Sequence, residues 1–205
     1  MVVIILISML ALLAVPSMAT AREDRLAFRS ADQLARVVHE ARTRAMARGA
    51  AQLVVLTTNG TSDRGTAIAY ETLDATLHPI SSCKTPGQWA GAILGGSATN
   101  PVVAGHNLNG TAASLQAQTG LETAMTVSGV AALVTVMCFT PGGRVYAVPS
   151  AAGPTSAAVN ALPVAQPFTG EVVLAVMRKR GGGTAQGLTR NVIISASGAT
   201  RIRSQ

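Results

Sequence analysis

This chain of 205 residues contains three histidines, His39, His78 and His106, whose side chains can serve as acids or bases near neutral pH. A histidine acts as a general base when a nucleophile or an acid is held beside it, but the sequence contains no GxSxG, HExxH or P-loop pattern. The histidines also fall in unrelated segments, so we interpret each as a surface or loop residue. The sequence therefore predicts no catalytic residue, no bound cofactor and a protein that is not an enzyme.

Cys83 and Cys138 are the only cysteines, and no CxxC or HxxxH spacing occurs, so no metal site is predicted. One interpretation is a single disulfide between them in a domain that lies outside the cytoplasm. The alternative is that Cys138, inside an apolar run, is a small buried hydrophobic residue. The sequence leaves both interpretations open.

The chain is basic, with a formal net charge of +7. From residue 51 onward there are nine basic and five acidic residues, a net charge of +4 that is spread thinly. Such spacing favours a solvated surface over a nucleic-acid footprint. The densest basic run, Arg178-Lys179-Arg180, precedes Gly181-Gly182-Gly183, which we interpret as a flexible connection because no Walker lysine follows it.

The first element that positions these groups is a helix. Met1 to Val15 carries no charge and one polar side chain, Ser8, whereas charged residues begin at Arg22. One helical stripe then follows at steps of four and three, formed by Ala27, Ala31, Leu34, Val38, Ala41 and Ala45. We predict a helix over residues 1–50, with residues 1–21 as a transmembrane and assembly segment and a bend at Pro16.

Short β-branched runs separated by turn residues predict a β-rich head over residues 51–205. The predicted strands are Gln52 to Thr58, Thr66 to Glu71, Ala132 to Phe139, Arg144 to Val148, Glu171 to Met177, Arg190 to Ser197 and Thr200 to Arg203. The run from Ala132 to Phe139 is typical of a strand covered on both faces. We expect an α+β fold with two antiparallel sheets, one of them covered by the amphipathic half of the helix.

Two segments of the head lack a clear strand pattern. Turn dipeptides throughout residues 72–121 predict loops and short edge strands, in which Trp89 is either an anchor to the core or a contact for a partner. Pro149 to Pro167 is predicted to be a loop. Asn59-Gly60-Thr61 and Asn109-Gly110-Thr111 fit the glycosylation sequon, but turn chemistry explains both.

Several of these residues resemble a known family. Val2-Val3-Ile4-Ile5 and Leu10 to Ser17 are similar to the hydrophobic segment of type IV pilins and type II secretion pseudopilins. The run from Asp32 to Gly49 resembles, more narrowly, the helix of the GspH/FimT group of minor pseudopilins, with its L-x-x-A-R-x-x-A pattern. Phe139 to Arg144 and Arg190 to Gly198 resemble the turn and the last strand of that group. The resemblance covers the first quarter of the chain and about twenty later residues.

The resemblance implies a type IV pilin-like fold and a structural role. The subunit would assemble by burying its apolar helix residues against those of its neighbours, here Val2, Val3, Ile4, Ile5, Leu6, Leu10, Leu12, Leu13, Val15 and Pro16. Its partners would be other pilin or pseudopilin subunits and an inner-membrane assembly platform. It would start as a single-pass inner-membrane protein with a periplasmic head and finish in a secretion pseudopilus or a surface pilus.

One part of the family pattern is missing. The glycine at which prepilin peptidase cuts, before the residue that is then methylated, and the following glutamate have no counterpart, because aligning Pro16 with the family proline places the mature end a few residues before Met1. We expect that the start has been assigned to an internal methionine. A truncated copy is the alternative.

Two other functions stay open at this point. Ala19-Thr20-Ala21 follows an apolar run, so residues 1–21 could be a cleaved signal peptide that releases a secreted β-domain. Some FimT-like minor pilins bind DNA during uptake through a basic C-terminal segment. The candidate DNA contacts here are Arg201 and Arg203, with Arg178, Lys179 and Arg180.

Overall fold

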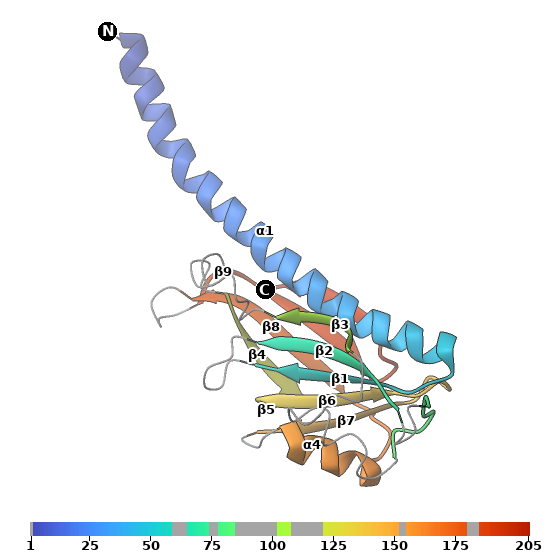
Figure 1. Cartoon of the computed structure of the whole chain (residues 1–205). Helices are drawn as coiled ribbons and strands as arrows, with labels where there is room; N and C mark the ends of the chain where they lie inside the picture. The colour runs from blue at the N-terminus through green and yellow to red at the C-terminus, as the bar shows by residue number, and fades with distance from the viewer. Residues whose placement is uncertain are drawn as a thin grey trace.

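The computed structural model describes residues 2–58, 65–73, 78–84, 102–107, 121–151, 155–179 and 185–205, and for residues 2–20, 22–23, 107, 155–157, 179 and 185–186 it describes the backbone alone. Within these ranges a long N-terminal helix joins a head of two antiparallel sheets (Figure 1). Trp89, both sequons, Arg180 and Gly181 to Gly183 lie outside the described residues.

Helix α1 (Val2–Arg48) has 47 residues and continues through Pro16. Figure 1 shows it curving gradually along its length rather than bending at one point, so the predicted bend at Pro16 is not a local kink. The helix ends before Gly49, whose φ of +66° is the left-handed conformation that commonly closes a helix. The helix predicted over residues 1–50 is therefore present.

Two five-stranded sheets form the head. The first sheet has the order β3 (Val102–Asn107), β2 (Thr66–Glu71), β1 (Gln52–Thr57), β6 (Val134–Phe139) and β7 (Val145–Ser150). The second sheet has the order β10 (Thr200–Ser204), β9 (Ala185–Ser195), β8 (Glu171–Lys179), β4 (Leu121–Val127) and β5 (Val130–Ala132). All described pairings are antiparallel.

The strand predicted over Ala132 to Phe139 is wrong at its start. Ala132 belongs to β5 in the second sheet, whereas β6 begins at Val134 in the first. Leu133 is the crossing point, where its N–H donates to the carbonyl of Ser150 at 2.9 Å and its carbonyl accepts from the N–H of Thr58 at 2.8 Å. A continuous apolar run does not reveal this change of sheet because both halves are apolar. The predicted burial of both faces of β6 is confirmed.

The strands of the second sheet are longer than predicted. β8 continues to Lys179, so Arg178 and Lys179 are strand residues and not part of a flexible connection. β9 begins at Ala185 instead of Arg190. The additional pairs, Arg178 with Gln186 and Lys179 with Ala185, follow an irregularity in register after Val176. The polar side chains at this end of the hairpin interrupt the apolar pattern from which strands are predicted.

The main core lies between the sheets and beneath the helix. It contains Leu34 and Val38 of α1, Val54 and Leu56 of β1, Met137 and Phe139 of β6, Leu174 of β8 and Ile194 of β9. The helix contacts strands of both sheets, so the expectation that it covers one of them is wrong. With few aromatic residues, the interior is built largely from Val, Leu, Ile, Ala and Met.

The loop predicted over Pro149 to Pro167 is also wrong. It contains α4 (Thr155–Ala161) and the short helix η1 (Leu162–Val164). Ala158, Val159 and Leu162 are buried on the outer face of the first sheet, where they form a second apolar cluster with residues of β1, β6 and β7. The short helix was missed because two prolines and many small residues lie close to its few core positions.

A disulfide joins Cys83 to Cys138 in this second cluster. The sulfur atoms are 2.02 Å apart, the Cα atoms 5.9 Å apart, and the residues are separated by 55 positions in the chain. Both cysteines are buried. The bond fastens the segment that contains Cys83 to β6, which lies between β1 and β7 in the first sheet.

Candidate assembly surface

The N-terminal part of α1 projects away from the head (Figure 1). All residues of the predicted assembly segment, from Val2 to Pro16, lie in this projecting part and have helical backbone. Over the residues that could be searched, which are those the structure describes, no helix is both long enough and apolar enough to span a membrane. The membrane role of residues 1–21 is therefore taken up below as a proposal.

The second half of α1 is fixed to the head by small side chains. Ala27, Ala31, Leu34, Val38, Ala41 and Ala45 are each at most 3% exposed. Alanine at four of these contact points lets the helix axis approach the strands closely, while Leu34 fills the space between the sheets. The predicted stripe is confirmed, and because it is fully buried we expect the projecting half to be held in a fixed direction from the head.

A cluster of three residues holds the helix at the point where it leaves the head. Nη2 of Arg190 on β9 donates a hydrogen bond to Oδ2 of Asp24 at 2.6 Å, and the guanidinium carbon of Arg190 lies 5.7 Å from the ring centre of Phe28. The Arg190 side chain is only 16% exposed. The cluster combines a partly buried ion pair with a cation–π contact, so it favours one orientation of the helix. The residues of the ion pair are 166 positions apart, and no local pattern in the sequence links them.

Ion pairs of two kinds occur farther along the helix. Arg48 donates to Oε2 of Glu71 at 2.7 Å, and the Glu71 side chain is almost fully buried. Asp32 with Arg36 and Glu40 with Arg44 are exposed pairs one turn apart, at 2.8 and 2.7 Å. Exposed pairs of this kind contribute only about 0.3–0.5 kcal/mol each. Arg48 with Glu71 therefore gives the second fixed point, at the end of the helix.

Gly198 allows the last hairpin to pack under the helix. Its φ is +76°, and a Cβ at this position would lie 2.6 Å from Cε1 of Phe139 and 3.2 Å from Cδ of Arg42. A residue with a side chain would therefore be strained in its backbone and would also collide with the core. The turn that contains Gly198 fixes β10 against β9.

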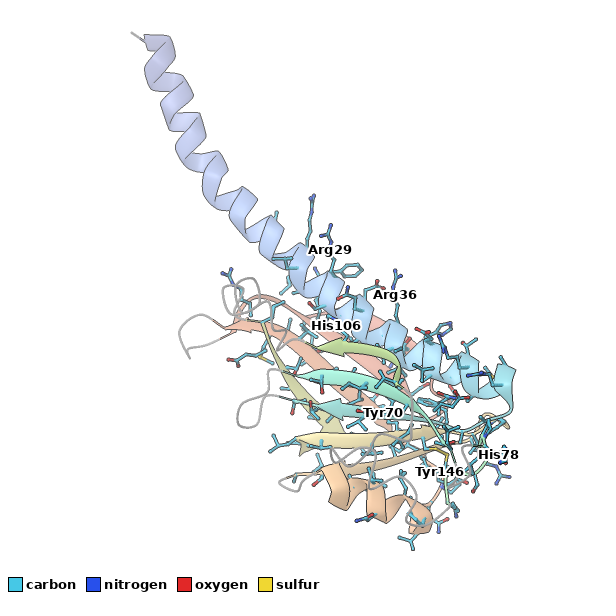
Figure 2. All side chains as sticks on the ribbon, in the orientation of Figure 1. Arg29, Arg36, Tyr70, His78, His106 and Tyr146 are labelled. Atoms are coloured by element: carbon cyan, nitrogen blue, oxygen red, sulfur yellow. A yellow bond between two sulfur atoms is a disulfide. The ribbon has the colours of Figure 1, made fainter. Side chains whose placement is uncertain are left out.

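His106 differs from its prediction as a surface or loop residue. It lies in β3, and Figure 2 shows it beneath helix α1. A cavity of about 320 Å³ is lined by Gln33, Arg36, Val37 and Glu40 of α1 and by Ala104, Gly105 and His106 of β3. Burial lowers the pKa of His106 below its usual 6.5, and its Nε2 has no partner among the described residues. His39 and His78 are exposed.

The charged side chains of Arg36 and Glu40 in the cavity lining have partners on the helix. They form ion pairs with Asp32 and Arg44, respectively. Within the described ranges, no group of three or more His, Cys, Asp or Glu side chains could hold a metal ion. Burial also raises the pKa of Tyr70, on the outer face of the first sheet, because it disfavours the charged phenolate. Burial within the fold therefore accounts for the pKa shifts of both His106 and Tyr70.

The structure separates the candidate DNA contacts. Arg201 and Arg203 are exposed and share one face of β10, where Arg201 also lies 3.9 Å from Glu171. Arg178 pairs across the sheet with Leu121, which belongs to the main core. Because directly paired side chains share a face, the Arg178 side chain leaves the sheet on the face opposite to that of Arg201 and Arg203. Lys179 follows Arg178 at the end of β8. The described candidates thus form no single basic surface.

Among known proteins, matches to this chain were found in solved structures. No family model matches the sequence, and no curated protein matches it. Among solved structures, the chain is similar to the type IV minor pilin FimU of Pseudomonas aeruginosa strain PAO1 at 16% sequence identity and a TM-score of 0.41, covering 89% of this chain and 90% of that one. For a second crystal form of FimU the identity is 16%, the TM-score 0.37 and the coverage 86% and 90%.

Proposed function

We propose that the chain is a structural subunit of a pilin-type filament and that it assembles through the projecting half of α1. The observation that carries the proposal is that only the second half of this 47-residue helix packs on its own head, while the half with the most apolar sequence extends beyond it (Figure 1). A helix of this kind needs an apolar environment that its own head does not provide.

Burial of the apolar residues in the projecting half would supply the driving force for assembly. Each buried methylene contributes about 0.8 kcal/mol, so residues 2–15 together would contribute tens of kcal/mol when they are removed from water. A bilayer provides such an environment before assembly, and helices of neighbouring subunits provide it afterwards. The second half of α1 is attached to the head by the buried alanine stripe and by the ion pairs of Asp24 and Arg48. The head would therefore be positioned by the way in which the projecting half packs.

The finer assignment rests on the sequence resemblance. We propose a minor pseudopilin or minor pilin of the GspH/FimT type, which would lie in the inner membrane as a single-pass protein with its head in the periplasm. It would then join other subunits in a type II secretion pseudopilus or a type IV pilus, with an inner-membrane platform as the assembly partner.

Photo-crosslinking tests the proposal. A photoreactive phenylalanine analogue is placed at Leu13 in the full chain, which is expressed in cells that assemble a pilus or pseudopilus. We expect crosslinks to other pilin subunits from Leu13. The matched control is Val130, the first residue of β5, which is 68% exposed on the head and is not expected to give the same products.

Analysis of the mature N-terminus provides the second part of the test. Intact mass and N-terminal sequencing should find residues 1–21 retained in the mature chain. A mature protein that begins at Arg22 would favour the signal-peptide alternative and contradict the proposal. Retained residues without any pilin crosslink from Leu13 would also contradict it.

A further inference from the structure

Exposed basic and apolar side chains gather at the end of the head from which α1 projects. Arg25, Phe28 and Arg29 on the helix and Leu188 on β9 are all exposed, Phe28 by 46% and Leu188 by 48%. We call these four residues the junction patch. We infer that the junction patch binds the head groups of anionic phospholipids at the bilayer surface, an inference that rests on the proposed membrane role of residues 1–21.

The contacts of α1 and β9 place Leu188 at this end. Asp24 meets Arg190 near the start of the contact, and Arg42 meets Gly198 at its other end, so the helix and the strand run in the same direction. Residues of β9 before Arg190 therefore lie toward the projecting part of the helix, as Figure 1 shows. Leu188 precedes Arg190 by two positions, beside the irregular part of β9, so its exposed side chain lies at this end of the strand.

The charges of the patch are not balanced within the described part of the chain. Arg25 and Arg29 are one helical turn apart, where like charges repel, and neither makes an ion pair with a described residue. Among the side chains that the structure describes, the carboxylates nearest in the helix already have partners, since Asp24 binds Arg190 and Asp32 binds Arg36. Figure 2 shows Arg29 extending from the helix away from the sheets. An external anion would relieve this repulsion.

The position along the helix indicates where that anion is. At about 1.5 Å of rise per residue, Arg25 and Arg29 lie about 6 and 12 Å beyond residue 21, the end of the apolar stretch. The polar layer on each side of a bilayer is about 5–7 Å thick, so the Arg25 side chain is at the level of the phosphates and Arg29 can reach toward them. Phe28, which directly precedes Arg29 in the helix, and Leu188 at the same end of the head favour an amphipathic surface over a free phosphate ion.

The substitution Phe28→Trp tests the inference in the full chain, because it places a fluorophore within the junction patch. The variant is reconstituted into phosphatidylcholine vesicles that contain a small fraction of phosphatidylglycerol, with bromine on the acyl chains of one lipid or the other. Its fluorescence is taken as the difference from the unsubstituted chain, which contains Trp89. At equal mole fractions of brominated lipid, we expect brominated phosphatidylglycerol to quench the introduced tryptophan more strongly than brominated phosphatidylcholine. The expected local enrichment of phosphatidylglycerol is about fivefold for each arginine at low salt.

Variants of matched charge identify the source of the enrichment. Arg25→Gln with Arg29→Gln should bring the quenching by the two lipids close to equality. Arg36→Gln with Arg44→Gln removes the same charge from the same helix, farther from the projecting half, and should leave the difference unchanged. Near-ultraviolet circular dichroism checks that every variant is folded.

Flotation of the vesicles separates the two possible failures. A chain that does not float with them contradicts the membrane role in the proposed function and the present inference with it. A chain that floats, but in which both brominated lipids quench the introduced tryptophan equally, overturns the inference alone. The inference is also overturned if the Arg36 and Arg44 variant loses the difference in quenching between the two lipids as fully as the Arg25 and Arg29 variant does.

Discussion

Arg190 of β9 and Asp24 of α1 form a hydrogen-bonded ion pair of 2.6 Å that connects the last part of the head to the helix where the helix leaves it. Because both side chains are mostly screened from water, removing either one leaves a charge without its partner. We expect Arg190→Met and Asp24→Asn each to lower the free energy of unfolding by about 1–3 kcal/mol.

A double-mutant cycle measured by urea unfolding checks this. The double variant should lose less than the sum of the two single variants, because the interaction is lost only once. The exposed pair Asp32 with Arg36 is the control, and its variants should stay within about 0.5 kcal/mol of the parent. Additive losses at Asp24 and Arg190 would show that the two residues act independently.

Gly198→Ala should destabilise the head. The new Cβ would meet Phe139 at 2.6 Å, and the backbone has a φ of +76°. We expect a loss of at least about 1–3 kcal/mol in thermal or chemical unfolding. Gly142→Ala is the control, because no heavy atom lies within 4 Å of a Cβ there and its φ is not in the left-handed range. Equal stability of the two variants would contradict the packing described for Gly198.

The Cys83–Cys138 disulfide should stabilise the fold by restricting the unfolded chain. For a separation of 55 residues the chain-entropy model gives about 4 kcal/mol. Reduction without substitution should shift the urea midpoint downward, and Cys83→Ala with Cys138→Ala should shift it at least as far. An unchanged midpoint after complete reduction would mean that the bond does not restrict the unfolded state.

Stability should depend on pH through His106. Its pKa is lowered in the folded protein by burial, so the unfolded state takes up the proton first as the pH falls. The stability contributed by the neutral form is complete above about 6.5 and is lost as the pH falls from 6.5 through the lower, folded pKa. Arg36 and Glu40 line the same cavity, but each is held by another partner.

The pH dependence attributed to His106 is tested by comparing the urea midpoints of unfolding at pH 7.5 and pH 5. His106→Gln should reduce the difference between the two pH values, whereas His39→Gln, at an exposed position of α1, should not. If both variants keep the full pH dependence, carboxylates rather than His106 are responsible for it.

The parts of the fold that were predictable depend on local geometry. The stripe from Ala27 to Ala45 follows the helical repeat, so the residues that face the core can be read from their spacing alone. β2 was predicted with its observed bounds, because its alternating pattern is bordered by turn residues. The short helix α4 was not predictable in this way, since seven small or polar residues have too little periodicity to separate a helix from a loop.

The sequence by itself determined that a long helix with one buried stripe precedes a head of antiparallel strands, because these patterns arise from contacts between residues close in the chain. Tertiary structure alone decided that the chain changes sheet at Leu133, that Arg190 reaches Asp24, and that Arg178 and Arg201 start from opposite faces. The physical reason is that each of these depends on which strands become neighbours, and that choice is made by packing between segments far apart in sequence.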